Sequence, residues 1–329
     1  MTTENADADH VPERLAMLSA LVNGDTSLAY RLATDCLANG VGFDRIVDHI
    51  LQPVQAEVGR RWADGELGIA DEHASTAAIE ELLIRLAATA QEPEGPTVVI
   101  TSAEKDTHAL GARAVASALA LDGFRAVFIG PSMPATELHH FLEVQQPAAL
   151  ALSCSLPSAL AGAAASASVA HAVSIPVVGG GGAIIGADRA ARLGFDAFAG
   201  SPHDAVECLR TWAVTPPDRL RLSPEPVPEG RALARRGPTL IAGAIDAAND
   251  GGDPHATAFE ELTRVLQVVE SALLLDEPDL VSEHLHWLRD TGPAHGFALA
   301  TIDATLTNLA RAMDGDLERA RDALRLAMV

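Results

Sequence analysis

Five short apolar runs, each followed by a helix-like stretch, constrain the fold of the middle of the chain more than any other feature. The runs lie at 97–101, 126–130, 148–153, 176–180 and 197–200, and the helix-like stretches at 111–122, 135–145, 158–172, 187–193 and 203–212. Strands that alternate with helices in this way form a doubly wound parallel sheet with right-handed crossovers. The sequence therefore predicts an α/β domain over residues 96–213, with a five-stranded Rossmann-like or flavodoxin-like sheet. Ligands of such sheets bind beyond the carboxyl ends of the strands.

Helical segments flank this domain on both sides. Apolar residues at three- and four-residue spacing predict a four-helix bundle cap over 1–95, with Asp25 and Asp44 as helix N-caps. Six prolines between 214 and 238 predict a linker, and 239–329 reads as a second all-helical domain. The expected cap helices span 10–23, 25–39, 42–63 and 70–91, and the expected C-terminal helices lie near 256–275, 279–290, 295–313 and 316–328.

The charge distribution argues against a nucleic-acid binder. The chain has 23 basic and 45 acidic residues, a net charge of −22, which repels phosphate backbones and anionic lipid. The acid is concentrated at the ends: residues 1–96 hold 6 basic and 17 acidic residues, 97–214 hold 6 and 9, and 237–329 hold 6 and 16. The nearly neutral middle therefore suits a large ligand of little charge, and the acidic ends suit a protein partner.

The cysteine content and the lack of targeting and membrane-spanning segments bear on the cellular compartment of the protein. Cys36, Cys154 and Cys208 are too few and too scattered for a disulfide framework or a zinc cluster. The acidic N-terminus has no basic region or apolar core of a signal peptide, and no tract reads as a membrane span. We expect a cytoplasmic protein.

The loop after the first strand carries the strongest chemical signal. His108 follows Asp106 by two residues, at a carboxyl end of a strand and just before a helix opened by Gly111. Such an Asp can hold one ring nitrogen and leave the other free as a metal ligand, although an Asp–His surface pair would have the same sequence.

Two further features are expected at the same sheet edge. Strand three ends in Ser153 and Ser155, which are candidate contacts or helix caps. Strand four ends in Gly179 and Gly180, where the lack of side chains leaves room for a bulky group or simply forms a flexible turn.

The pattern Asp-x-His-x-x-Gly, then Ser, then Gly-Gly resembles the cobalamin-binding domain of methionine synthase and its relatives. The resemblance covers roughly 10–213. It implies that His108 replaces the cofactor's own dimethylbenzimidazole on the lower face of cobalt, with Asp106 as its partner. It also implies that Ser153 or Ser155 contacts the displaced nucleotide tail and that Gly179 and Gly180 make room for it.

The cap carries a second signature. Trp62 ends the third expected helix, while Glu72 and His73 open the fourth, so an antiparallel hairpin brings all three to one end of the bundle. The plain alternative is a core Trp and a Glu that stabilises a helix N-terminus. The spacing resembles that of the CarH group of light-sensing cobalamin repressors, in which these residues cover the 5′-deoxyadenosyl group of adenosylcobalamin.

Two departures from that group limit the resemblance. The position after the Trp holds Ala63, where those repressors carry a His that captures cobalt after photolysis. A bis-His photoproduct would then need His73 or another residue. We also expect no direct DNA repression, because no DNA-binding domain precedes the bundle and the chain is acidic.

The C-terminal domain has one distinctive run, residues 283–290. On a helix, His284 and Leu288 share one face and His286 lies about 200° from His284, which is also the pattern of an ordinary amphipathic helix with a core Trp. The domain looks like a globin-like sensor, and the domain order resembles that of the photocobilins, which bind biliverdin or another bilin as well as cobalamin. That resemblance implies bilin contacts at His284, His286, Trp287, Arg289 and Asp290, with Arg264 and Arg311 as further basic partners.

Together these features predict a light sensor that binds adenosylcobalamin (cobalt) base-off and His-on, acts through a homo-oligomer or a signalling partner, and is not an enzyme. One alternative is a corrinoid methyl-carrier protein of a methyltransferase system. A second is a cobalamin-sensing regulatory module without photochemistry. Nothing in the sequence suggests hydrolytic or nucleophilic catalysis.

Overall fold

The five predicted strands form one parallel sheet in the order β2-β1-β3-β4-β5. This is the flavodoxin-like order, with the switch point between β1 and β3, where Ser102 pairs with Ser153. The strands are β1 (Thr97–Ser102), β2 (Arg125–Phe128), β3 (Ala149–Ser153), β4 (Val177–Gly180) and β5 (Ala197–Phe198). The predicted fold class is confirmed, and the strands end within three residues of the expected positions.

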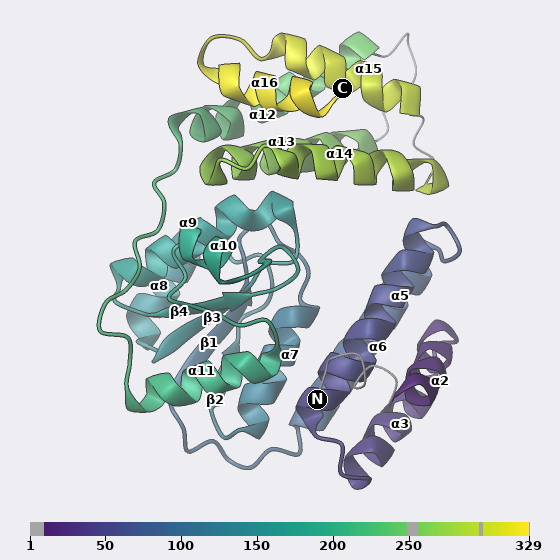
Figure 1. The fold of residues 1–329 in the computed structure, drawn as a ribbon, viewed down its shortest axis with the longest axis vertical. Coiled ribbons are helices and arrows are strands. Elements are labelled where there is room, and N and C mark those ends of the chain that lie inside the picture. Colours follow the sequence, from purple (N-terminus) through teal and green to yellow (C-terminus); the bar gives the residue numbers. More distant parts are fainter. Residues whose placement is uncertain (1–9, 249–255, 296–298, 329) are drawn as a thin grey trace.

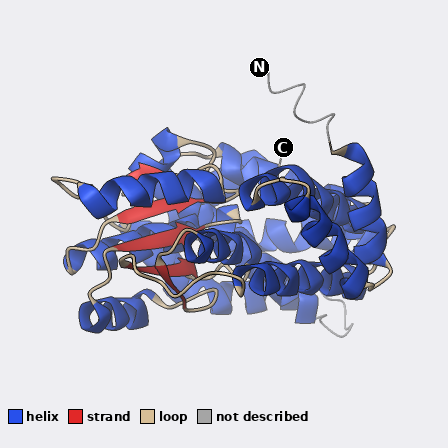
Figure 2. Cartoon of the chain, turned by 90° about the horizontal axis from the view of Figure 1, so that it is seen from below, coloured by secondary structure: helices blue, strands red, loops and turns tan. Residues whose placement is uncertain are grey.

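Helices cover both faces of the sheet, as Figure 2 shows. One face packs on α7 and α11, and the other on α8 and α9. These elements are α7 (Leu110–Leu121), α8 (Ala135–Gln145), η2 (Pro157–Ala159), α9 (Leu160–Ala172), α10 (Ala187–Arg192) and α11 (Pro202–Val214).

The computed structural model describes residues 10–248, 256–295 and 299–328. Its N-terminal part is the predicted cap, made of α2 (Val11–Val22), α3 (Thr26–Ala38), a long third helix and α6 (Ile69–Ala87). The third helix runs through α4 (Phe43–Ile46), a π-helical segment η1 (Val47–Leu51) and α5 (Gln52–Ala63).

The two predicted N-caps of the bundle differ in outcome. Asp25 caps α3, since its carboxylate accepts a hydrogen bond from the Leu28 amide at 2.8 Å. The prediction for Asp44 is wrong: Gly42 is the N-cap of α4, and Asp44 lies in the first helical turn. An acidic side chain is favourable in either position, which is why the sequence does not separate them.

The C-terminal domain begins earlier than predicted. Helix α12 (Pro228–Ala248) includes residues 228–238, so the expected linker is wrong over that stretch. Pro228 is tolerated because it opens the helix, and Ala232 and Leu233 provide a buried face even though Pro238 lies inside the helix. The remaining elements are α13 (Ala256–Leu275), α14 (Asp279–Thr291), η3 (Gly292–His295), α15 (Leu299–Ala312), η4 (Gly315–Leu317) and α16 (Glu318–Ala327).

The C-terminal domain lies across the edge of the sheet at which the strands end, and α14 reaches over the end of α5 (Figure 1). Helix α13 and the turn after it contact the α/β domain at three places. Lys105 in the loop after β1 pairs with Glu270 of α13 at 3.2 Å, Ser271 of α13 accepts a hydrogen bond from the Ala161 amide of α9, and Arg189 of α10 pairs with Glu277 in the turn after α13. One hydrophobic cluster continues from the α8–α9 face of the sheet into α12–α16. The domain therefore adjoins the edge where ligands of such sheets bind.

Among the described residues, no helix is both long and apolar enough to cross a bilayer.

Candidate functional site

The loop after β1 places His108 at the carboxyl edge of the sheet. The Ser102 hydroxyl donates to the His108 carbonyl at 2.6 Å, and the Asp106 amide donates to the Ala103 carbonyl at 2.9 Å. These bonds fold the loop back on the strand end. The His108 side chain remains 55% exposed, so its ring is accessible from outside the domain.

Asp106 is the buried centre of this loop. Its side chain is fully buried and accepts hydrogen bonds from the amides of His108 at 3.0 Å and Ser155 at 2.5 Å. The same carboxylate lies 3.0 Å from Nδ1 of His108. A buried carboxylate at Nδ1 fixes the proton there, which leaves the lone pair of Nε2 free for a metal. The predicted pairing of Asp106 with His108 is confirmed.

The surroundings of His108 come from all three parts of the molecule. The hydrogen bond to Asp106 raises the pKa of the imidazole, partial burial opposes that rise, and the charges of Asp106 and Glu72 add to it. Arg264 of α13 lowers the same pKa. The charges of Glu72 in the cap and Arg264 in the C-terminal domain thus act on the His108 imidazole in opposite directions.

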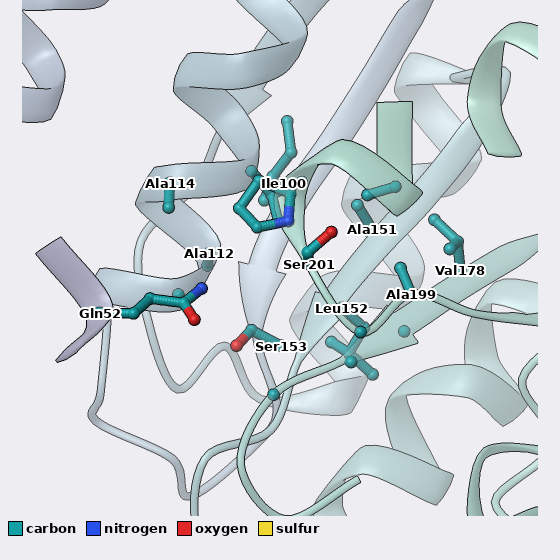
Figure 3. Close-up of a pocket in the computed structure, with 18 residues that line it drawn as sticks. Gln52, Ile100, Ala112, Ala114, Ala151, Leu152, Ser153, Val178, Ala199 and Ser201 are labelled. Atoms are coloured by element: carbon teal, nitrogen blue, oxygen red, sulfur yellow. The ribbon is translucent and has the colours of Figure 1, made fainter. Parts of the chain in front are cut away.

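A cavity of about 90 Å³ lies along the ends of β1, β3 and β4 and the start of α7. Figure 3 shows Gln52, Ser153 and Ser201 around it. Ser153 therefore lines the cavity, and its predicted contact with the nucleotide tail stays a prediction. Ser155 does not line it and instead uses its backbone amide to hold Asp106.

The glycines at the end of β4 line the cavity and also allow close packing within the domain. A Cβ on Gly179 would lie 2.2 Å from the Phe195 ring, and one on Gly180 would lie 2.0 Å from the Ala199 carbonyl oxygen. Gly111 is similarly confined, with the Ser153 hydroxyl 2.9 Å from its Cβ position. The glycines are thus needed by the protein's own packing, in addition to the predicted room for a ligand.

The cap residues Trp62, Glu72 and His73 lie at one end of the bundle, as the hairpin predicted. Glu72 accepts a hydrogen bond from Thr76 at 2.8 Å, and its other oxygen is 2.5 Å from Nδ1 of His73. The His73 ring is 72% exposed, whereas Trp62 packs against the C-terminal domain, with its ring centroid 4.3 Å from that of His295.

The residues proposed for a bilin do not converge on one face of α14. His284 is half-buried and stacks on Trp287, while His286 and Asp290 are exposed, as the spacing predicted for His286. Arg289 pairs with Asp303 of α15 at 3.1 Å, and Arg311 is exposed.

Several residues of the site carry no clear sequence signal. Gln52 reaches the cavity from the cap, and Ser201 reaches it from the N-terminus of α11. Arg264 and His295 come from the C-terminal domain. Their positions follow from how the domains pack. A Ser-Pro pair opening a helix after the last strand is the one local signal, and it points only to Ser201.

Comparison with known proteins agrees with this geometry. Two family models match, each described as a B12 binding domain, one over residues 14–87 and the other over 96–210. A trimethylamine corrinoid protein from Methanosarcina barkeri is 25% identical over 198 residues, which cover 57% of this chain and 90% of that protein. Neither family model extends beyond residue 210.

Among solved structures, the chain matches a monomethylamine corrinoid protein from Methanosarcina barkeri. It is 20% identical with a TM-score of 0.49, and the match covers 59% of this chain and 94% of that one. The methanol:cobalamin methyltransferase complex of the same organism is 18% identical with a TM-score of 0.36, and the match covers 67% of this chain and 87% of that one.

The residues present fit a cobalamin. A free Nε2 on His108 suits the lower face of cobalt, and the cavity lined by Ser153 and the β4 glycines opens at the same edge of the sheet for the displaced tail. The chain thus carries both B12 binding domains, over 14–87 and 96–210, and it belongs with the cobalamin-binding proteins.

Proposed function

We propose that this chain is a regulatory light sensor that holds adenosylcobalamin between the cap and the sheet edge. The observation that carries the proposal is the position of Trp62, whose ring is held by His295 and Trp287 of a domain that neither B12 family model includes. Because the C-terminal domain covers this end of the cap, the arrangement suits a cofactor that stays bound and does not react with another enzyme. It suits less well a carrier whose cobalt must meet another enzyme.

Each part of the site has a distinct task in this proposal. Asp106 keeps the proton on Nδ1 of His108 and so presents Nε2 to the cobalt. The cavity beside Ser153 takes the nucleotide tail, and Trp62 with Glu72 borders the upper ligand. When bound, adenosylcobalamin supplies a cobalt–carbon bond that light can break.

The signal would travel through the contact between the cap and the C-terminal domain. The latter is fixed to the α/β domain by ion pairs and a shared hydrophobic cluster, so a displacement of the cap must change the packing of Trp62. Output through another protein that carries basic groups fits the strongly acidic cap and C-terminal domain, because two acidic surfaces of the same chain repel each other. We propose a regulatory rather than a catalytic role.

The test is reconstitution of the full chain with adenosylcobalamin in the dark, followed by green light. We expect the alkyl-cobalt absorbance to be lost and the elution volume on size-exclusion chromatography to change, while a dark sample stays constant. His108→Ala should bind weakly and lose its spectrum far more slowly. A wild-type spectrum that green light leaves unchanged contradicts the proposal.

The second candidate is a corrinoid methyl carrier, and the similarity to the trimethylamine corrinoid protein favours it. It requires methylcobalamin to bind at least as well as adenosylcobalamin and requires the methyl group to pass to a partner methyltransferase. Equilibrium binding of the two cofactors to the full chain in the dark separates the candidates. A clear preference for methylcobalamin would favour the carrier.

Binding of a bilin by the C-terminal domain stays a prediction. His284 and Trp287 are the two proposed residues that stack together, and Arg264 is near enough to lower the pKa of His284. Absorbance in the red after expression with biliverdin is the measurement that tests it.

A further inference from the structure

Lys105 is the only lysine among the 329 residues, and all the other residues that carry a full positive charge are arginines. It lies in the turn between β1 and His108, which is closed by a hydrogen bond from the Asp106 amide to the Ala103 carbonyl. The backbone φ of Lys105 is 71°, in the left-handed region that favours glycine. A lysine at the third position of such a turn is strained where a glycine would not be, which suggests a use for its ammonium group.

The Lys105 ammonium reaches the C-terminal domain. Its Nζ lies 3.2 Å from the Glu270 carboxylate of α13, and both side chains are partly buried. The stem of Glu270 packs on α12, where a Cβ on Gly230 would lie 3.4 Å from its Cγ. Glu270 is therefore held by the C-terminal domain, and Lys105 attaches the turn before His108 to it.

The next residue of α13, Ser271, contacts the helix on which the same turn rests. Its buried hydroxyl accepts a hydrogen bond at 3.2 Å from the Ala161 amide in the first turn of α9. The N-cap of α9 is Ala159, whose side chain cannot satisfy that amide, so Ser271 caps the helix from another domain. A Cβ on Gly162 would lie 2.1 Å from the Glu104 carbonyl oxygen, so the turn packs directly on α9. Two adjacent residues of α13 thus hold the turn and the helix beneath it.

The ion pair differs from the other contacts of the His108 loop. Asp106 orients the His108 imidazole within the loop, and the Lys105 amide donates to the Ser132 hydroxyl at 3.1 Å. Those bonds lie inside the α/β domain. The Lys105–Glu270 pair instead joins residues 165 positions apart, and so it relates the position of the whole turn to the C-terminal domain.

We propose that Lys105 and Glu270 are positioning residues for the predicted cobalt ligand. Their ion pair sets where the turn before His108 lies relative to α13, and so it raises the affinity of the chain for cobalamin. The inference rests on the proposed function only in taking His108 as the lower ligand of cobalt. By linkage, binding of cobalamin through His108 also strengthens the attachment of the C-terminal domain.

The first measurement uses the full chain without cofactor. Acetic anhydride acetylates lysine side chains, and Lys105 is the one lysine that can react, so the mass of its peptide gives the rate. Removal of the Glu270 carboxylate uncovers the amine and weakens its hold on the proton, so Lys105 should react faster in Glu270→Gln than in wild type. Glu260→Gln, an exposed change on the same helix, should react like wild type. Equal rates in all three proteins overturn the inference, because the pair then does not form in solution.

The second measurement is the dissociation constant of the full chain for adenosylcobalamin, by equilibrium dialysis in the dark. Glu270→Gln and Lys105→Met should each bind about two- to fivefold more weakly, which is the loss expected for a partly exposed ion pair. Lys105→Arg keeps a cation and should match wild type, as should Glu260→Gln. Thermal unfolding without cofactor checks that each variant retains the fold. Unchanged affinity in the first two variants overturns the inference.

The same change in a His108→Ala background separates positioning from a general effect on the fold. If Glu270 acts through His108, Glu270→Gln weakens binding in wild type but has no effect once His108 is gone. An equal loss in both backgrounds overturns the inference. If His108→Ala alone binds like wild type, the proposed cobalt ligand is wrong and the inference fails with it. Failure of wild type to respond to green light would refute the photosensor alone.

Discussion

The lower and upper halves of the cofactor site are built in different ways. The lower half comes from one loop and the strand ends beside it, and Asp106 is satisfied there by two amides and an imidazole. The upper half comes from α5 and from α14 and η3, which follow α5 by more than 200 residues, and three of its buried nitrogens have no hydrogen-bond partner within the described residues. The lower half is thus fixed by residues close together in the sequence, whereas the upper half exists only because the C-terminal domain packs on the cap.

The strongest test of the local half is the metal ligand itself. His108→Ala should weaken cobalamin binding by at least about 100-fold, because losing a ligand should exceed the 10–100-fold range of outer partners. The bound spectrum should also change, since no imidazole holds the cobalt from below. Titration followed by absorbance measures both, with the exposed His140→Ala as the matched control. Equal affinities for the two variants would show that the lower half does not bind cobalt through His108.

Asp106→Asn tests the hydrogen-bond partner of His108 rather than the predicted cobalt ligand itself. The amide can donate where a carboxylate only accepts, which disturbs the proton on Nδ1 of His108 and the contact with the Ser155 amide. We expect cobalamin binding to weaken roughly 10–100-fold, with the cobalt still His-ligated in the bound fraction. Asp188→Asn, an exposed change in the same domain, should have no effect. A comparable loss in both would point to net charge instead of the Asp106–His108 pair.

The close packing of the β4 glycines predicts an effect on stability. Gly180→Ala places a methyl group against the Ala199 carbonyl and should lower the free energy of unfolding by about 1–3 kcal/mol. Gly182→Ala, whose Cβ would lie 3.3 Å from the Ser155 carbonyl oxygen, should cost clearly less. Chemical denaturation without cofactor gives both values. If the two variants unfold alike, the glycines serve the ligand alone.

The assembled half should respond to pH through His284. Burial, and then the charge of Arg264, lower the pKa of this imidazole to about 4. A lowered folded-state pKa means that the neutral ring stabilises the fold above the unfolded pKa of about 6.5, and that this contribution is lost as pH falls from about 6.5 to 4. His284→Gln should therefore lose about 2 kcal/mol less stability than wild type between pH 7 and pH 4.5. If the free energy of unfolding falls equally with pH in wild type and His284→Gln, the His284 imidazole is solvated and this prediction is wrong.

Patterns of neighbouring residues in the sequence predict most of the secondary structure and the lower half of the cofactor site. The strand ends, the helix predicted at 256–275 and the Asp106–His108 pair all follow from residues close together in sequence. The failures came where two local signals compete. Prolines predicted a linker through 238, but Pro228 opens α12 and Leu233 lies in its buried face. Acidic residues favour several positions at a helix start, so Asp44 was misplaced by two residues.

By itself, the sequence determined that a parallel sheet would present His108 at its carboxyl edge beside Ser153 and the β4 glycines, since all parallel strands end there. Only the tertiary structure decided that Gln52 and Ser201 complete the cavity and that Trp62 lies against His295 and Trp287. Those contacts join segments far apart in the chain. The packing of one domain on another decides which of these residues meet, and the local periodicity of the sequence does not contain that information.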